Sequence, residues 1–462
     1  MKKQILILFI AIIGFQALSA QDDEIIHEDK VYVDYIKSVV FHIEGIETSY
    51  PVIQLNSSSQ LLFRFDDMGG GFYDYTYEIV HCDRNWNPST DITEFDFLEG
   101  FNGELIRDYS NASLTTVNYT KYQLSLPNEN IKWTISGNYV LIIKDDQELP
   151  IITRRFMVVD PEIKIEAYAT KPARVEYLDT GQALDFKITT KDFPISDPMT
   201  EIKVSFMQNG RWDNAYTNVS PTYTAGDEIF FRDPNRYFFP AQKEFRSLDM
   251  RNFEYTTVEV HSIDRHPDRT DVILEIDKDR ANRNYLTTPD ANGSFVIQNL
   301  MGRFTQQLDD SEFVDPVTGE QLEGSLLARA RLLESLNSSG RERDSDYAHV
   351  QFTLNIDKLD KDVYIVGKFN DWRPTKEYKL EYSEKYNSYL CNVLLKQGYY
   401  DYYYAVIDDE GKIDTELLEG NWHETENDYL AIVYYRPFGE NYDQIIGFIT
   451  LNTSVESSYK RN

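Results

Sequence analysis

The sequence predicts an all-β protein made of tandem immunoglobulin-like β-sandwich domains with one short helical insertion. Aromatic residues form 14% of the chain, with 33 Tyr and 26 Phe, and such side chains suit the half-buried faces of β-sheets. Short segments in which apolar and polar residues alternate recur between turn residues, as expected for strands with one buried face. Apolar residues make up 41% of the chain, enough to build cores, so the composition argues against disorder.

The N-terminal segment has the three parts of a bacterial secretory signal. Residues 1–3 carry positive charge, residues 5–17 are nearly all apolar, and small residues end the segment at Ala20. This pattern predicts a signal peptide over residues 1–20, cleaved between Ala20 and Gln21. The apolar run is shorter than the ~20 residues of a membrane-spanning helix, so a permanent N-terminal anchor is the less favoured interpretation. We expect a soluble, exported protein that does not insert into the membrane and is monomeric when free.

The domain boundaries follow from turn residues and from changes in the hydrophobic pattern. The 462 residues exceed what one core usually serves, and Asp160-Pro161 marks the first boundary. The expected units after the signal peptide are a sandwich at 21–160, a second sandwich at 161–301, a charged insertion or linker at 302–346, and an early-set-like sandwich at 347–462. The clearest expected strands are 60–65, 73–79, 139–143, 154–159, 163–167, 184–188, 202–206, 271–276, 350–354, 363–366, 389–395, 399–407 and 445–451.

The insertion contains one predicted helix. Between Gln321 and Asn337 the leucines are spaced as on one face of an amphipathic helix. We expect this helix to pack on its own domain, and a partner-binding helix is the alternative. The charged segment after Gly340 predicts a mobile linker.

Net charge and cysteine content exclude several classes of protein. The formal net charge of −31 repels phosphate backbones and anionic lipid, so we expect no nucleic-acid partner. Solubility explains this charge, and a partner with a basic rim is the alternative. Cys82 and Cys391 fall in different predicted domains, each in a strand-like segment. We therefore expect two free, buried thiols.

The sequence offers no cluster of catalytic or metal-binding residue types. The seven histidines are scattered and form no paired zinc motif. His81 and Cys82 are neighbours on a predicted strand, so their side chains point to opposite faces and cannot act as base and nucleophile. Acidic residues near Asp360 lack the spacing of a calcium loop. We expect a protein that is not an enzyme, with no catalytic residues, no metal and no cofactor.

One segment of the last unit resembles a ligand-binding module. Residues 363–372 are similar to the strand and turn of glycogen-binding modules and related early-set immunoglobulin-like domains. In those modules exposed tryptophans stack on sugar and a lysine holds it. Trp372 matches the first tryptophan, Tyr403 stands at the lysine position, and residues 408–414 contain no second tryptophan. The resemblance implies a glycan contact at Trp372 and Tyr403 at most, and a secreted carbohydrate-binding protein is the alternative function.

Longer segments resemble another family over nearly the whole mature chain. The plug protein of the Bacteroidetes type IX secretion system is similar at residues 77–89, 97–102, 119–128, 136–139, 367–372, 418–429 and 434–440. The insertion at 302–346 is longer than this family needs. The resemblance implies a non-enzymatic periplasmic protein that sits on the periplasmic mouth of an outer-membrane translocon barrel and closes its pore. An exported, acidic β-sandwich protein without a catalytic cluster is compatible with that role. For Trp86 and Pro88 we expect a strand-end turn with a packed indole.

Overall fold

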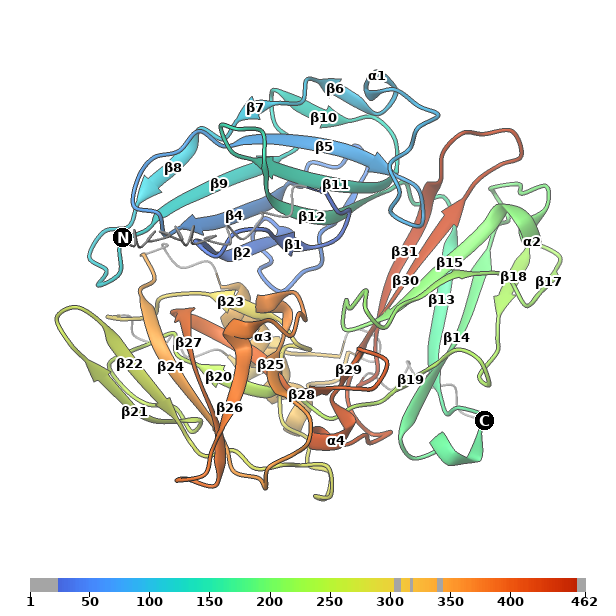
Figure 1. Ribbon diagram of the computed structural model, residues 1–462. Helices are drawn as coiled ribbons and strands as arrows, with labels where there is room; N and C mark the ends of the chain where they lie inside the picture. The colour runs from blue at the N-terminus through green and yellow to red at the C-terminus, as the bar shows by residue number, and fades with distance from the viewer. Residues whose placement is uncertain (1–23, 303–308, 316–318, 339–343, 455–462) are drawn as a thin grey trace, which may run out of the picture.

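The computed structural model describes residues 24–302, 309–315, 319–338 and 344–454 (Figure 1). Outside these residues lie the predicted signal peptide and its cleavage position at Ala20 and Gln21. The charged linker after Gly340 is outside them up to residue 343. Strands account for 43% of the chain and helices for 9%. The predicted all-β sandwich class is therefore confirmed.

The first sandwich is formed by the N-terminal part of the chain, in blue and cyan in Figure 1. Its six-stranded sheet contains β1 (Lys30–Val31), β12 (Pro150–Val159), β11 (Gly137–Lys144), β5 (Thr76–Cys82), β7 (Glu104–Leu105) and β3 (Val52–Gln54). The facing sheet contains β2 (Ile36–Ile43), β4 (Leu61–Asp67), β9 (Thr120–Leu126) and β8 (Asp108–Asn111). Beside them lie α1 (Glu94–Phe97) and the pair β6 (Leu98–Gly100) and β10 (Ile131–Trp133).

Aromatic side chains fill the core between these two sheets. Strand β9 alternates strictly between buried and half-buried residues, because successive side chains point to opposite faces of a sheet. Phe65 stacks on Tyr122 with ring centroids 5.1 Å apart, and Tyr139 stacks on Phe156 at 5.3 Å. The aromatic richness of the sequence is thus used for core packing.

The second sandwich lies at the right of Figure 1. One sheet contains β13 (Lys164–Thr170), β14 (Gly181–Thr189), β18 (Glu228–Phe231), β17 (Tyr223–Ala225) and β19 (Phe238–Pro240). The other contains β16 (Tyr216–Val219), β15 (Ile202–Gln208), β30 (Asp428–Tyr435) and β31 (Gln444–Asn452). The short helix α2 (Pro198–Glu201) precedes β15.

A ten-stranded sheet forms the third part of the molecule. Its strands are β20 (Arg246–Asp249), β21 (Val260–Arg265), β22 (Thr270–Leu274), β23 (Phe295–Ile297), β24 (Tyr347–Leu354), β25 (Val363–Val366), β26 (Lys379–Ser383), β27 (Ser388–Lys396), β28 (Gly398–Ile407) and β29 (Ile413–Asp414). The helices α3 (Gly324–Asn337) and α4 (Glu416–Glu419) accompany it.

Strand pairing does not follow the predicted boundaries at residues 301 and 347. The C-terminal strands β30 and β31 belong to the second sandwich, where β30 pairs with β15 over seven residues from Ile202 to Gln208. Conversely, β20 to β23 pair within the ten-stranded sheet, and β20 runs antiparallel to β28. The two C-terminal units therefore exchange strands. The alternation of apolar and polar residues shows that a segment is a strand. The neighbouring strand with which it pairs depends on long-range packing, which the local sequence pattern does not predict.

The helix predicted at 321–337 is present as α3. Its Leu332, Leu333 and Leu336 pack against a cluster that includes Val296 and Tyr399 of the ten-stranded sheet. The helix therefore packs on the ten-stranded sheet through these leucines. At its end, the side chains of Asn337 and Thr48 are hydrogen-bonded at 3.0 Å, so α3 also contacts the first sandwich.

Buried contacts join the three parts. An apolar cluster that includes Val140, Met157, Ile432 and Ile445 lies between the first and second sandwiches. On the other side, Asp66 Oδ2 of β4 accepts from Lys396 Nζ at 2.6 Å and from the Tyr347 hydroxyl at 2.6 Å. Since these contacts exclude water, the parts form one continuous body.

Candidate functional site

Trp372 and Tyr403 lie in the protein interior. Tyr403 is fully buried and Trp372 is 8% exposed. The ring of Phe245 stacks on Tyr403 with centroids 4.0 Å apart, and the guanidinium of Arg211 lies 4.3 Å from the Trp372 ring. A sugar needs an exposed ring face, so burial contradicts the glycan contact expected at these two residues. The resemblance to glycogen-binding modules missed the covering residues because these come from segments before the last predicted unit.

His81 and Cys82 have separate partners, as their positions on β5 predict. The His81 Nδ1 atom lies 2.8 Å from Ser89 Oγ, and burial lowers the pKa of His81 to about 4. Burial also raises the pKa of the Cys82 thiol to about 12. Both thiols are free and buried, which confirms that expectation. Within the described ranges, no group of three or more His, Cys, Asp or Glu side chains is placed to hold a metal ion.

The predicted turn after β5 lies at the contact between the first two sandwiches. Trp86 has a positive φ of 67° and is 5% exposed. Its ring meets Trp212 of the second sandwich edge-on, with centroids 5.0 Å apart. The packed indole expected from the sequence is confirmed, and it packs across a contact between two parts of the protein.

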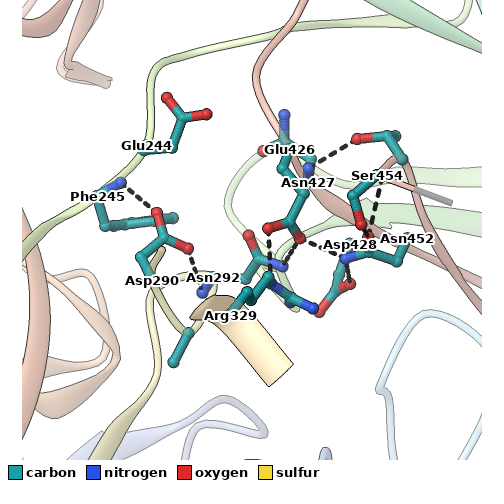
Figure 2. A network of polar contacts seen from close by, with 12 residues as sticks. Glu244, Phe245, Asp290, Asn292, Arg329, Glu426, Asn427, Asp428, Asn452 and Ser454 are labelled. Carbon is teal, nitrogen blue, oxygen red and sulfur yellow. Dashed lines mark hydrogen bonds and ion pairs between the residues drawn. The ribbon is translucent and has the colours of Figure 1, made fainter. Parts of the chain in front are cut away.

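A polar network surrounds the point where α3 meets the two C-terminal parts (Figure 2). Arg329 extends from α3, and its Nε atom lies 2.6 Å from Glu426 Oε2. The other oxygen of Glu426 accepts from the side-chain amides of Asn292, at 2.8 Å, and of Asn452. Asn452 also donates to Asp428 Oδ1 at 2.7 Å. Arg329 thus ties the helix to a carboxylate that precedes β30.

Two further buried carboxyl groups lie next to this network. Asp290 accepts from the backbone N–H of Phe245 at 2.6 Å. Asp401 Oδ2 accepts from the backbone N–H of Ala291 at 2.7 Å and of Gly293 at 3.1 Å. These bonds hold the loop before β23 against β28.

Burial controls the protonation of these carboxyl groups. It raises the pKa of Asp401 to about 7 and that of Asp290 well above its usual value. Burial also raises the pKa of Glu426, although the charge of Arg329 opposes this shift. Desolvation disfavours a charged carboxylate unless a cation compensates it. Burial therefore favours the neutral form of these carboxyl groups.

A cavity of about 360 Å³ lies where the first sandwich, the second sandwich and the ten-stranded sheet meet. Its lining includes the partly exposed ion pair between Arg373 and Glu28, at 2.8 Å. Its wall includes apolar and aromatic side chains together with charged ones: Phe41, Tyr50, Met157, Met207, Trp212, Trp372, Arg154, Arg155, Lys368 and Asp371.

Sequence reasoning missed both the polar network and the cavity. Their residues are far apart in the sequence, as Arg329 and Glu426 show. One local signal was available, because Arg154-Arg155 interrupts the otherwise apolar segment of β12. Adjacent charges in a buried strand indicate a site where charge is compensated or used.

Comparison with known proteins identifies the first sandwich. Residues 36–160 match the family model of the type 9 secretion system plug protein, first domain. The chain carries the first domain of the type IX secretion plug family. A solved structure of a hypothetical protein from Parabacteroides merdae is similar with a TM-score of 0.79 and 29% sequence identity, over 93% of this chain and 100% of that one. No curated protein matches the chain.

The plug domain supports a role related to type IX secretion, and the family suggests a periplasmic location. The family is not known as enzymatic. Within the described residues, none of the helices combines the length and the apolar character that crossing a membrane requires. The plug domain comprises nearly all of the first sandwich, so the second sandwich and the ten-stranded sheet extend it.

Proposed function

We propose that this protein is a non-enzymatic periplasmic plug, which binds the outer-membrane translocon barrel of the type IX secretion system and occludes its periplasmic opening. The match of residues 36–160 to the plug domain carries this proposal. Export through the segment 1–20 is part of it. The burial of Trp372 and Tyr403 leaves no observation that favours a carbohydrate-binding function.

The way in which the plug domain is fastened supports a steric role. A protein that occludes a pore has to keep its shape when force acts on it. The plug domain is joined by ion pairs to the ten-stranded sheet on one side and to the second sandwich on the other. The ion pair between Asp66 and Lys396 is almost fully buried, with side chains 3% and 6% exposed. On the other side, Arg84 donates to Asp443 Oδ1 at 2.7 Å. Breaking a buried pair by removing one partner costs about 3–5 kcal/mol, so the domain resists displacement.

Co-purification tests the partner. The full chain with a C-terminal affinity tag is expressed in the bacterium that naturally produces it. Outer membranes are then solubilised with mild detergent. We expect the translocon barrel to co-purify with the tagged chain and not with a tagged periplasmic protein of similar charge. Recovery of no barrel component above that control contradicts the proposal.

A flux measurement tests occlusion separately from binding. The purified barrel is reconstituted in liposomes that contain a small fluorescent dye, and the full-length chain is added on the periplasmic face. We expect the chain to slow dye release several-fold. If the chain binds the barrel but the rate of dye release is unchanged, the protein is a partner of the translocon that does not occlude its pore.

A further inference from the structure

The cavity at the junction of the three parts has the dimensions of a ligand site. Its volume of about 360 Å³ lies at the lower end of the ~300–1,000 Å³ typical of small-molecule pockets. Such pockets commonly lie between domains, and a few polar groups in an apolar wall determine what they bind. The charged groups of this wall therefore bear on what the cavity can bind.

Lys368 is a cation of the wall that forms no ion pair with the residues that the structure describes. It lies in the turn after β25, and its Nζ atom is 5.6 Å from the ring centroid of Tyr50. Among the described residues, no carboxylate lies within ion-pair distance of Nζ, and burial lowers the pKa of Lys368 to about 8. Asp29 and Asp371 act on this ammonium group only from a greater distance.

Arg155 is the second such cation. Its guanidinium lies over Trp86 at 4.6 Å and over Trp212 at 5.3 Å from the ring centroids. Its Nε atom donates to the His27 carbonyl oxygen at 2.7 Å. Within the described part of the chain, its terminal nitrogens have no carboxylate at ion-pair distance.

Most carboxylates of the wall form ion pairs with cations other than Lys368 and Arg155. Each of four has a cation partner: Asp371 has Arg154 at 3.2 Å, Glu28 has Arg373 at 2.8 Å, Glu47 has Arg64 at 3.1 Å, and Asp213 has Arg211 at 2.6 Å. Asp29 accepts from the backbone N–H of Arg155 at 2.8 Å. Lys368 and Arg155 therefore have no carboxylate at ion-pair distance among the described residues, and Asp29, Glu28 and Asp371 act on them only through longer-range attraction.

A ligand that suits this wall is an anion with an apolar body. Arginine binds carboxylates with directional hydrogen bonds, and lysine adds a point charge. The rings of Tyr50, Trp212 and Trp372 and two methionines supply apolar surface. We propose that the cavity binds a small carboxylate with an aromatic or aliphatic body, held by Lys368 and Arg155. This chemistry is shared by free organic acids and by the C-terminal residue of a polypeptide.

Calorimetric titration of the full mature chain tests this site. The probes are N-acetylphenylalanine, 3-phenylpropionate and N-acetylphenylalaninamide, which has the shape of the first probe without its charge. We expect at least one carboxylate to bind with a Kd below about 1 mM, and the amide to bind at least about tenfold more weakly. Tighter binding of N-acetylphenylalanine than of 3-phenylpropionate indicates a chain terminus, and the reverse indicates a free acid.

Substitution of Lys368 assigns the binding to the cavity. Lys368→Met should weaken carboxylate binding at least about tenfold, while Lys368→Arg should retain most of it. Lys132→Met removes an exposed lysine of β10 and should change nothing. Thermal unfolding of each variant shows that it is folded. The proposal is overturned if neither carboxylate binds, if the amide binds equally well, or if folded Lys368→Met binds like the unsubstituted chain.

Discussion

Arg246 and Glu419 form an ion pair across 173 residues of sequence, with Arg246 Nε 2.9 Å from Glu419 Oε1. The Glu419 side chain is fully buried. Arg280 Nε donates to the second carboxylate oxygen at 2.7 Å, and the backbone N–H of Tyr404 donates to the first at 3.0 Å. The pair thus links β20 of the ten-stranded sheet to α4.

Glu419→Gln should destabilise the protein strongly, because it removes the counter-charge of Arg280 and leaves the buried Arg246 with Asp277 as its remaining carboxylate partner. We expect a loss of about 3 kcal/mol in the free energy of unfolding, measured by urea titration at neutral pH. Although burial opposes ionisation, Arg246 and Arg280 lower the pKa of Glu419 to about 2. This depressed pKa gives stability that is present above the unfolded value of about 4.5 and is lost as pH falls towards about 2.

Glu416→Gln is the matched control, since Glu416 is exposed on the same helix. It should change stability by less than about 0.5 kcal/mol. Equal effects of the two substitutions would show that the buried pair does not stabilise the fold.

Asp401→Asn should reduce the dependence of stability on pH. Burial raises the pKa of Asp401 to about 7. Because the folded value is above the unfolded one, this carboxyl stabilises the fold below about pH 4 and loses that contribution as pH rises through about 7. Between about pH 5 and pH 8, the unsubstituted chain should lose about 2 kcal/mol of stability through this group, and the amide variant should lose less.

Chemical unfolding at both pH values measures this difference. The raised pKa values of Asp290 and Glu426 act in the same direction, so some dependence on pH should remain in the variant. A variant with the full pH dependence of the unsubstituted chain would contradict the assignment to Asp401.

Gly100→Ala should be much more harmful than Gly103→Ala. Both glycines have positive φ, at 107° and 87°. A Cβ at position 100 would lie 1.9 Å from the Asn130 carbonyl oxygen, whereas position 103 is open. We expect a loss of about 3 kcal/mol at position 100 and about 1 kcal/mol at position 103, measured by urea unfolding. Similar losses would show that backbone conformation alone, and not the close approach of the Asn130 carbonyl, requires Gly100.

Both cysteines should resist thiol reagents in the folded protein. Burial raises the pKa of each thiol to about 12, and the thiolate is the reactive form. Reaction with a chromogenic disulfide reagent at about pH 8 should be slow in buffer and fast in urea. Rapid reaction of either thiol in buffer would contradict its burial.

Several features followed from the sequence alone. Local alternation located thirteen of the strands: for example, the segment 202–206 is part of β15. The leucine spacing at 321–337 located α3 to within three residues at its start. Residues 73–75 were expected in a strand, but β5 begins at Thr76. The backbone N–H of Tyr73 instead donates to the hydroxyl of Tyr122. The resemblance to the plug family, carried by runs such as 77–89, was confirmed for the first domain.

Only the tertiary structure decided which strands share a sheet and which side chains are covered. Strand β30 pairs with β15 across more than 200 residues of sequence, and Phe245 covers Tyr403 from another strand region. The cations Lys368 and Arg155 meet at one cavity for the same reason. A repeating pattern records whether one face of a segment is buried, because that depends on the segment itself. What lies against that face depends on chain segments far away, and it is determined only when the whole molecule packs.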